Sequence, residues 1–355
     1  MNFLVVGLNY RTAPLQLRER LAIAPRDLPA ALQAVRTIVH VDEAVILSTC
    51  NRVEVYVTSS SPSATFQELT GFLASRGRLV PEVLQPCLYH LIDREAEAHL
   101  FRVTAGLDSM ILGESQITAQ VKQAYLTAWA LGLTRPTLNC LFQKALHSAK
   151  VVRSNTRIAE GQASIGSAVV ALARQLFGGR LTACEVLLWG AGKAAEATAR
   201  HLLKGGIGQL WIVNRTQPKA QDLASLCQGG WLSWEQALKH LAHVDIAIVC
   251  TQAPHYVIDP ADVAAVLPQR CGRPLLIVDL AVPRNVDPVI RTMPLLYLYD
   301  IDDLQATTEA SHAARTLELV RCESIIQEQV GQLIERERTD QSVRWEGVMA
   351  QGGGL

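Results

Sequence analysis

The sequence predicts an α/β protein with an N-terminal α/β domain, a second domain built on a doubly wound parallel sheet, and a long C-terminal helix. Three observations carry this prediction. A cysteine at position 50 lies between two strand-like runs, and a glycine-rich turn at position 190 joins a strand to a helix. Short apolar runs then alternate with helical patterns as far as residue 299. We expect domain boundaries at 1–157, 158–300 and 301–355.

The composition excludes several classes of protein. Of 355 residues, 49% are hydrophobic and 19% charged, and the formal net charge is zero, so no overall field attracts nucleic acid. No apolar run is long enough to cross a membrane, and the N-terminus lacks the basic region of a signal peptide. The eight cysteines are too scattered for a zinc site or a disulfide framework. We therefore expect a protein of the reducing cytoplasm without a metal.

Residues 48–52 join two predicted strands. The run before them, 44–47, is apolar throughout, and the run after them, 53–58, alternates valines with polar residues. Cys50 therefore lies at a strand break, where reactive side chains are often presented. Arg52 would stabilise a thiolate, which is the nucleophilic form, or would hold a substrate carboxylate in its guanidinium fork. A small core cysteine without chemistry is the alternative.

A glycine-rich turn follows the apolar strand predicted at 186–189. Gly190, Gly192 and Ala195 fit the G-x-G-x-x-G/A fingerprint, which combines a tight turn, a close approach to pyrophosphate and close helix packing. The alanine-rich helix that follows, ending near Gly205, offers its first N–H groups to a phosphate. The pattern predicts a Rossmann-type dinucleotide domain. Its further strands are expected at 210–213, around Trp231, and at 246–250, 275–279 and 296–299.

The residues after the second strand of that sheet indicate the cofactor. NAD-binding proteins usually carry an acidic residue there, which accepts hydrogen bonds from the ribose 2′-hydroxyl. This chain has Asn214, Arg215 and Thr216 instead. An arginine with two small polar groups suits a 2′-phosphate, so the sequence favours NADPH over NADH.

Two helices are predicted between the cysteine and the nucleotide domain. Asp93 is expected to cap the first of them, which carries His99 and ends at Gly106. A histidine on a helix is catalytic or simply hydrogen-bonded in the core, and both roles stay open. Polar residues crowd among glycines from 106 to 117. The second helix has an apolar stripe of Ile117, Val121, Ala124, Tyr125 and Ala128.

Taken together, these motifs resemble the glutamyl-tRNA reductase family, which begins tetrapyrrole (porphyrin) biosynthesis. The likeness covers roughly residues 1–340. It implies NADPH-dependent reduction of glutamyl-tRNA(Glu) to glutamate-1-semialdehyde and free tRNA through a cysteinyl thioester. It also implies a homodimer and, as a further partner, glutamate-1-semialdehyde aminomutase. The segments that carry the resemblance are 7–9 with 12–14, 48–54, 99–103, 106–122 and 279–288.

The resemblance implies roles for single residues. Cys50 is the expected nucleophile, His99 the expected catalytic partner, and Arg52 the expected glutamate-specificity residue. Glu114 would take the substrate α-ammonium, orient Ser109 or cap the next helix. The implied substrate contacts are Thr49, Cys50, Asn51, Arg52, Ser109, Glu114, Ser115, Gln116 and Gln120. The implied NADP loop is Gly190, Ala191, Gly192, Lys193, Ala194 and Ala195. In one departure from the family pattern, Tyr10 stands where a histidine is common.

The C-terminal pattern bears on quaternary structure. Residues 301–304 resemble the start of the family's spinal helix. Because the chain turns polar after Arg336 and closes with glycines, we expect a shortened dimerisation region, a weakened dimer and mobile residues after about 338. An apolar stripe precedes this polar segment, and we expect it to be covered either by the chain's own catalytic domain or by a second subunit. It comprises Leu317, Val320, Cys322, Ile325, Ile326, Val330, Leu333 and Ile334.

Lys150, Arg153 and Arg157 are expected on one face of a helix at 140–157, as a solvated face or as a stripe that contacts tRNA phosphates. Two other functions remain as alternatives. A shikimate-dehydrogenase-like enzyme would reduce a free small molecule with NADPH and would need no cysteine. A non-catalytic NADPH-binding regulator would need none of the polar residues around Cys50.

Overall fold

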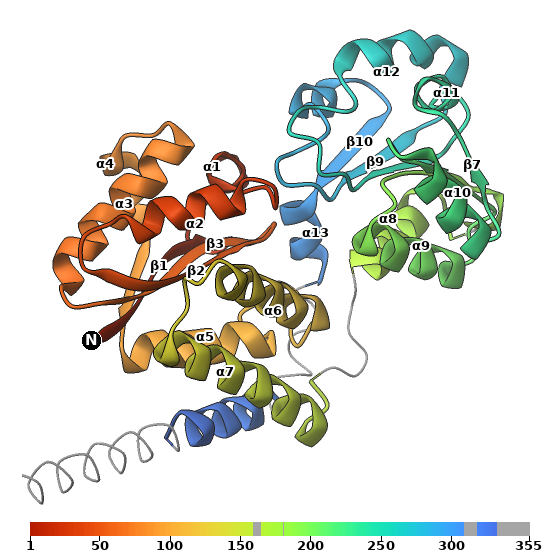
Figure 1. Cartoon of the computed structure of the whole chain (residues 1–355). Helices are drawn as coiled ribbons and strands as arrows, with labels where there is room; N and C mark the ends of the chain where they lie inside the picture. The colour runs from red at the N-terminus through yellow and green to blue at the C-terminus, as the bar shows by residue number, and fades with distance from the viewer. Residues whose placement is uncertain (159–164, 180, 309–317, 332–355) are drawn as a thin grey trace, which may run out of the picture.

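The computed structural model describes residues 1–158, 165–179, 181–308 and 318–331, and it contains two α/β domains (Figure 1). The first domain is built on an antiparallel sheet with the strand order β2-β3-β1-β4. Its central pairing joins β1 to β3 along the full length of both strands, which gives the site a rigid floor. The strands are β1 (Asn2–Asn9), β2 (Val41–Ser48), β3 (Arg52–Ser59) and β4 (Tyr89–Ile92).

Helices cover both faces of this sheet (Figure 1). All eight residues of β3 are therefore buried, so the polar members of the alternating run 53–58 lie inside the domain. Buried polar side chains require partners, and those partners form the site described below. The helices are α1 (Leu15–Leu21), α2 (Leu28–Arg36), α3 (Pro62–Gly77), α4 (Pro81–Leu84), α5 (Arg94–Ala105), α6 (Ser115–Ala130) and α7 (Pro136–Asn155).

The helix that carries His99 begins and ends as predicted, but its N-terminal contact differs. Gly106 closes α5 in the left-handed conformation, at φ 78°. Asp93 stands at the N-cap position without a side-chain cap. Its carboxylate instead accepts hydrogen bonds from the Phe3 backbone N–H at 2.9 Å and from the Asn2 amide at 2.7 Å, on the neighbouring strand. The apolar stripe of α6 is confirmed, since the same five residues are buried.

The second domain has a six-stranded parallel sheet with the order β10-β9-β8-β5-β6-β7, and every strand predicted there is confirmed. Hydrophobic clusters fill both faces of the sheet, as a doubly wound fold requires. The strands are β5 (Glu185–Trp189), β6 (Gln209–Val213), β7 (Gly230–Trp231), β8 (Ile246–Val249), β9 (Leu275–Asp279) and β10 (Leu296–Asp300). The helices are α8 (Ile165–Leu176), α9 (Lys193–Gly205), α10 (Gln217–Leu226), α11 (Trp234–His240), α12 (Pro260–Val266) and α13 (Ile301–Thr308).

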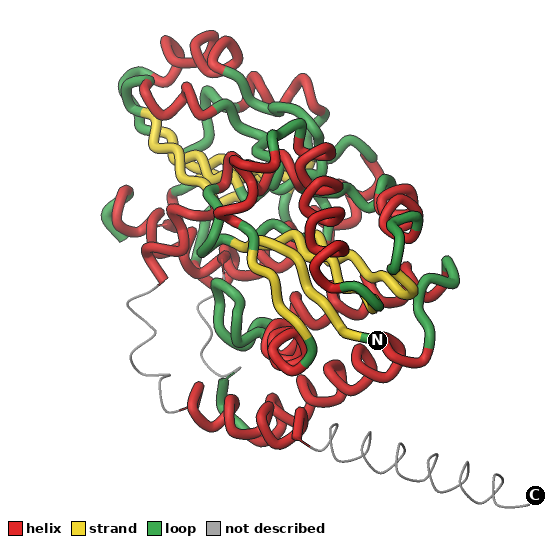
Figure 2. Tube along the Cα trace, turned by 90° about the vertical axis from the view of Figure 1, so that its left-hand side faces the viewer, coloured by secondary structure: helices red, strands yellow, loops and turns green. Residues whose placement is uncertain are grey.

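The helical segment 318–331 returns to the first domain (Figures 1 and 2). Cys322, Ile326 and Val330 are fully buried in the core of that domain. The first domain therefore covers part of the predicted apolar stripe. Val320 is 64% exposed, so the first domain does not cover this member of the stripe, and its burial against a second subunit stays a prediction. Leu317, Leu333, Ile334 and the expected tail after 338 lie outside the described residues. No helix within the described ranges is long and apolar enough to span a membrane.

Candidate active site

Cys50 lies in the tight turn between β2 and β3, where the sequence predicts a strand break. The Thr49 hydroxyl accepts hydrogen bonds from the backbone N–H groups of Asn51 and Arg52, each at 3.2 Å. The backbone N–H of Tyr10 donates to the Asn51 carbonyl at 2.9 Å, which ties the turn to the loop after β1. These bonds fix the backbone on either side of the thiol.

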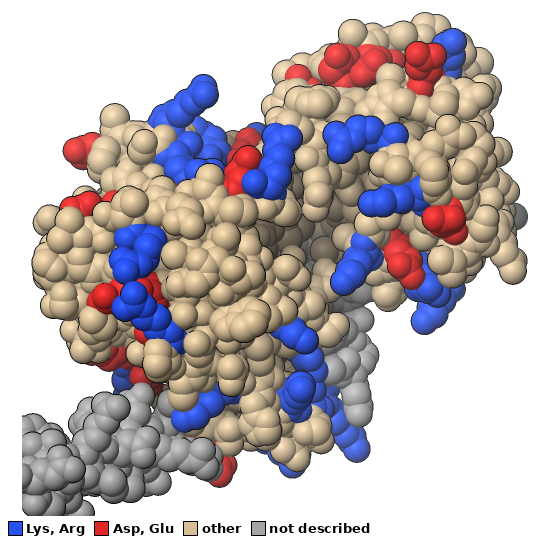
Figure 3. Space-filling view, viewed as in Figure 1, with Lys and Arg blue, Asp and Glu red and all other residues tan. Residues whose placement is uncertain are grey.

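The surroundings of Cys50 come from both domains. A small apolar cluster gathers α1, the loop before α6, the loop after β9 and the start of α13 around the cysteine. The thiol therefore lies at the junction between the domains, and Figure 3 shows a hollow there with Lys and Arg side chains on both of its sides. The cluster consists of Leu15, Met110 and Ile301, with Tyr10, Cys50, Ile165 and Val282 packed against them.

The resting thiol is not activated. Burial, followed by the charge of Glu114, raises the pKa of Cys50 to about 12. The cations Arg18 and Arg52 act in the opposite direction, and Arg18 has the larger effect of the two. The sequence points only to Arg52 as the partner of the thiol.

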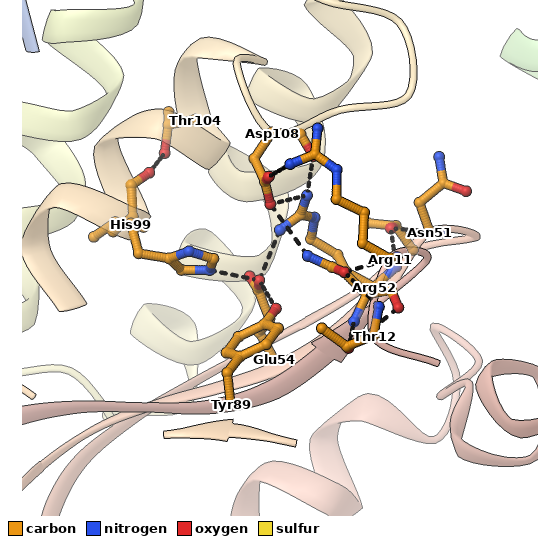
Figure 4. A network of polar contacts seen from close by, with 12 residues as sticks. Arg11, Thr12, Asn51, Arg52, Glu54, Tyr89, His99, Thr104 and Asp108 are labelled. Carbon is orange, nitrogen blue, oxygen red and sulfur yellow. Dashed lines mark hydrogen bonds and ion pairs between the residues drawn. The ribbon is translucent and has the colours of Figure 1, made fainter. Parts of the chain in front are cut away.

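Arg52 is the centre of a buried polar network (Figure 4). One terminal nitrogen donates to Glu54 Oε1 at 2.7 Å, and the other donates to the Asp108 backbone carbonyl and to its Oδ2 at 3.0 Å. The side chain is 1% exposed. A bidentate grip on a substrate carboxylate, as expected from the sequence, would require Arg52 to release Glu54 or Asp108. In this structure Arg52 neutralises two buried carboxylates, and its contact with a substrate stays a prediction.

The Glu54 carboxylate binds the aromatic side chains of this network. His99 Nε2 lies 2.7 Å from Glu54 Oε1, and the hydroxyls of Tyr56 and Tyr89 donate to the same carboxylate (Figure 4). Burial alone would raise the pKa of Glu54, but the charges of Arg52 and His99 outweigh it and hold that pKa well below its ordinary value. The ring of His99 also packs against Tyr89, with centroids 5.2 Å apart. These contacts orient His99 through Glu54.

Asp108 links the network to the surface. Its carboxylate accepts hydrogen bonds from Asn9 at 3.3 Å and from Arg11 at 2.9 Å, and the Arg11 side chain is 55% exposed. The sequence analysis does not identify Asp108, Arg11 or Arg18 as site residues. Among the residues of this network, Glu54 could have been predicted as a partner of Arg52, because residues 52 and 54 of one strand face the same side. The other contacts join residues 32 to 99 positions apart, which no local pattern reveals.

The segment before α6 holds the remaining predicted contacts. Ser109 is buried, and a hydrogen bond from it partly offsets the burial that raises the pKa of Glu114. Glu114 occupies the N-cap position of α6 without capping it, so the expected capping role is wrong and the contact with Ser109 is present. Beyond it, exposed polar side chains line the first turns of α6. They are Ser115, Gln116 and Gln120.

The basic stripe expected on one helix does not form as predicted. The helix α7 ends at Asn155, so Arg157 lies beyond it, with its backbone N–H bonded to Glu318. Arg153 donates to Thr118 on α6, while Lys150 is exposed. Only part of the stripe therefore remains available to a phosphate.

The glycine-rich turn has the geometry of a dinucleotide site. Gly190 adopts φ 118°, and a Cβ there would lie 2.4 Å from the Cys250 carbonyl oxygen, so only glycine fits. Gly192 is exposed, faces open space and precedes α9, whose first N–H groups point outward for a phosphate. Asn214 and the exposed Arg215 and Thr216 follow β6 without an acidic residue. These residues fit NADPH.

Comparison with known proteins identifies the family. The family model for the N-terminal domain of glutamyl-tRNAGlu reductase matches residues 6–156, and the model for shikimate / quinate 5-dehydrogenase matches 171–307. The chain is 42% identical over 330 residues to the glutamyl-tRNA reductase of Desulforudis audaxviator, covering 93% of this chain and 74% of that one. The chain belongs to the glutamyl-tRNA reductase family. The reductase of Trichlorobacter lovleyi is 39% identical over 330 residues, covering 93% of this chain and 76% of that one.

A solved structure agrees with this assignment. The glutamyl-tRNA reductase from Methanopyrus kandleri matches with a TM-score of 0.51 and 31% identity, over 96% of this chain and 82% of that one. As a member of this family, the chain is an NADP-dependent oxidoreductase that acts on glutamyl-tRNA in the first step of tetrapyrrole biosynthesis. The likeness to shikimate dehydrogenase covers the nucleotide domain alone, so it does not support the shikimate-dehydrogenase-like alternative.

Proposed function

We propose that Cys50 is the nucleophile of this reductase. Its sulfur attacks the ester carbonyl of glutamyl-tRNA, the bond to the tRNA 3′-terminal oxygen breaks, and a thioester remains on Cys50. A thioester accepts hydride more readily than an ester, so covalent catalysis divides one difficult reduction into two easier steps. The observation that carries this proposal is the position of Cys50, which packs against an apolar cluster that includes Ile301 of the nucleotide domain.

Substrate binding would itself activate the thiol. The α-ammonium group of glutamyl-tRNA would pair with Glu114, whose charge is one cause of the raised pKa of Cys50. Neutralising Glu114 leaves Arg18 and Arg52 to favour the thiolate. The thiol proton would pass to solvent, and His99 would donate a proton to the departing tRNA 3′-terminal oxygen. This order of events keeps the Cys50 thiol protonated until glutamyl-tRNA is bound.

The other predicted contacts would orient the aminoacyl end of the tRNA. Asn51 supports this, because its side-chain oxygen is buried without a hydrogen-bond partner in the described part of the chain. In this proposal Thr49 shapes the turn and Arg52 acts indirectly, by fixing Glu54 and Asp108. The exposed Arg11 takes the side-chain carboxylate of the substrate. The remaining contacts are Ser109, Ser115, Gln116 and Gln120.

The NADPH site would use the turn at Gly190, Ala191, Gly192, Lys193, Ala194 and Ala195. The α9 N-terminus would hold the pyrophosphate, while Asn214, Arg215 and Thr216 would surround the 2′-phosphate. When bound, NADPH supplies the hydride. The apolar cluster beside Cys50 would limit the access of water to the thioester until the reduction occurs.

Replacing Arg215 with alanine should weaken NADPH binding far more than NADH binding. One charge-assisted contact to phosphate is worth roughly 1.5–3 kcal/mol, or about tenfold to a hundredfold in the dissociation constant. Fluorescence titration with each cofactor measures the difference. Arg200 on α9, which pairs with Glu196, provides the control, and its alanine variant should affect neither cofactor. Equal losses for NADPH and NADH in Arg215→Ala would refute a phosphate contact.

We also infer a partner enzyme and a cellular compartment. The aldehyde product is reactive, which favours direct transfer to glutamate-1-semialdehyde aminomutase. All eight cysteines are free thiols, which suits a reducing cytoplasm.

A homodimer is the assembly we propose, weaker than is usual for the family. Much of the segment 318–331 is covered by its own domain, and the exposed Val320 leaves a small apolar surface for a second copy. Sedimentation velocity should show monomer at low micromolar and dimer at high micromolar concentration. A monomer at every concentration contradicts dimerisation, and a dimer at nanomolar concentration contradicts its weakness.

A further inference from the structure

The helix α1 connects the Cys50 turn to the nucleotide domain through two adjacent charged residues. Arg18 forms an ion pair with Asp302, at the start of α13. Glu19 pairs with Arg284, in the loop after β9, through contacts of 2.7 and 2.9 Å. That loop is itself well fixed, because the Asp279 carboxylate accepts three backbone hydrogen bonds from it. A movement of the nucleotide domain would therefore displace α1 or break these ion pairs.

Arg18 also contacts the nucleophile's own backbone. Its Nε donates to the Ala13 carbonyl at 3.2 Å and one terminal nitrogen donates to the Cys50 carbonyl at 2.6 Å, while the other reaches Asp302. The side chain is 1% exposed. One planar guanidinium thus joins the loop before α1, the Cys50 turn and the nucleotide domain. A lysine ammonium has no comparable fork.

Stability alone does not account for this arrangement. Burying a guanidinium is costly, and well-packed apolar residues often replace a buried ion pair without loss of stability. The charged groups that bear on the thiol are Glu114 before α6, Arg18 on α1 and Arg52 on β3. Of the two cations, Arg18 has the larger influence on the thiol and is the one bonded to the other domain.

We propose that Arg18 is a positioning residue for Cys50, and that its ion pair with Asp302 makes the reactivity of the thiol depend on the placement of the nucleotide domain. The proposal rests on Cys50 being the nucleophile. It gives the enzyme a means to couple acylation of Cys50 to the presence of the nucleotide domain beside it, before the thioester meets water.

Alkylation of the full-length enzyme by iodoacetamide tests the electrostatic part. At pH 8.5, without tRNA or NADPH, mass spectrometry measures the rate of alkylation of Cys50 relative to that of the exposed Cys140 in the same molecule. Arg18→Gln should slow Cys50 about threefold to tenfold, since a pKa one unit higher leaves tenfold less thiolate of somewhat greater nucleophilicity. Arg18→Lys should restore most of the rate. Arg20→Gln is the matched control, because the bonds of Arg20 within the described residues go to the Gly77 and Arg78 carbonyls.

The outcomes separate positioning from simple structural support. A residue that merely stabilises the turn would, when lost, expose Cys50 and accelerate its alkylation. Faster or unchanged alkylation in Arg18→Gln therefore overturns the proposal, as does equal slowing in the Lys and Gln variants. This readout involves no tRNA, so it stands apart from the nucleophile assignment, which fails separately if Cys50→Ser retains reductase activity.

A double-mutant cycle tests the coupling between the domains. Asp302→Asn should lower kcat about tenfold, and should have little further effect in an Arg18→Gln background, because both variants break the same link. Asp303→Asn is the control, since the partners of Asp303 lie within its own domain. The coupling would be contradicted if the kcat losses of the two single variants multiplied in the double variant. It would also be contradicted if Asp302→Asn kept full kcat.

Discussion

Cys50→Ser should reduce the turnover of glutamyl-tRNA by a thousandfold or more, on the order expected when a nucleophile is removed. Serine fills the same space in the turn between β2 and β3, so the fold and NADPH binding should persist. The hydroxyl is a far weaker nucleophile at neutral pH than a thiolate. Formation of glutamate-1-semialdehyde from charged tRNA and NADPH measures the loss.

Cysteines outside the site provide the controls for this variant. Cys140 on α7 and Cys271 are both exposed, and their serine variants should retain nearly full activity. If Cys50→Ser kept a tenth of the wild-type rate, or if either control variant lost activity to a similar extent, Cys50 would not be the nucleophile.

Arg52→Leu should destabilise the first domain by about 3–5 kcal/mol, because it leaves the carboxylates of Glu54 and Asp108 buried without their cation. For a protein of this size the melting temperature should fall by roughly 10 °C. Arg11→Ala removes the exposed partner of Asp108, and should instead raise the KM for glutamyl-tRNA with little change in melting temperature. Calorimetry and steady-state kinetics on both variants distinguish a core role from a substrate contact. An Arg52→Leu enzyme as stable as wild type would refute the core role.

The same network predicts how stability depends on pH. The pKa of Glu54 is lower in the folded protein than in the unfolded chain, so its contribution is fully present above the ordinary glutamate pKa of about 4.3. That contribution decreases as the pH falls below this value. Glu54→Gln should therefore be less stable than wild type at pH 7, and its stability should decline less steeply below about pH 4. Parallel decline in the two proteins would show that Glu54 is not the group responsible.

The nucleotide domain was largely predictable because its signals are local. Each strand of a parallel sheet is a short apolar run, and the turn at Gly190 needs glycine for a reason confined to a few residues. The apolar stripe of α6 was predictable for the same reason, since a helix repeats its buried face at fixed spacing.

The polar site was less predictable because its contacts are long-range. Arg52 meets Asp108 from 56 positions away, and Arg18 reaches Asp302 across 284. The sequence marks Arg52 as important but does not show that buried carboxylates already occupy its guanidinium. Asp93 similarly has the right identity for a cap, yet its partner lies on β1. Residue type and local position predicted the presence of these groups, whereas the choice of partner depended on the tertiary fold.

Trapping the acyl-enzyme tests the central claim most directly. The enzyme is mixed with tRNA charged with labelled glutamate, without NADPH, then quenched in acid, digested and examined by mass spectrometry. We predict a glutamyl group on the peptide that contains Cys50, its absence in Cys50→Ser, and its disappearance with formation of semialdehyde when NADPH is added before the quench. A glutamyl group on another cysteine, or reduction that proceeds while Cys50 stays unmodified throughout, would contradict the account.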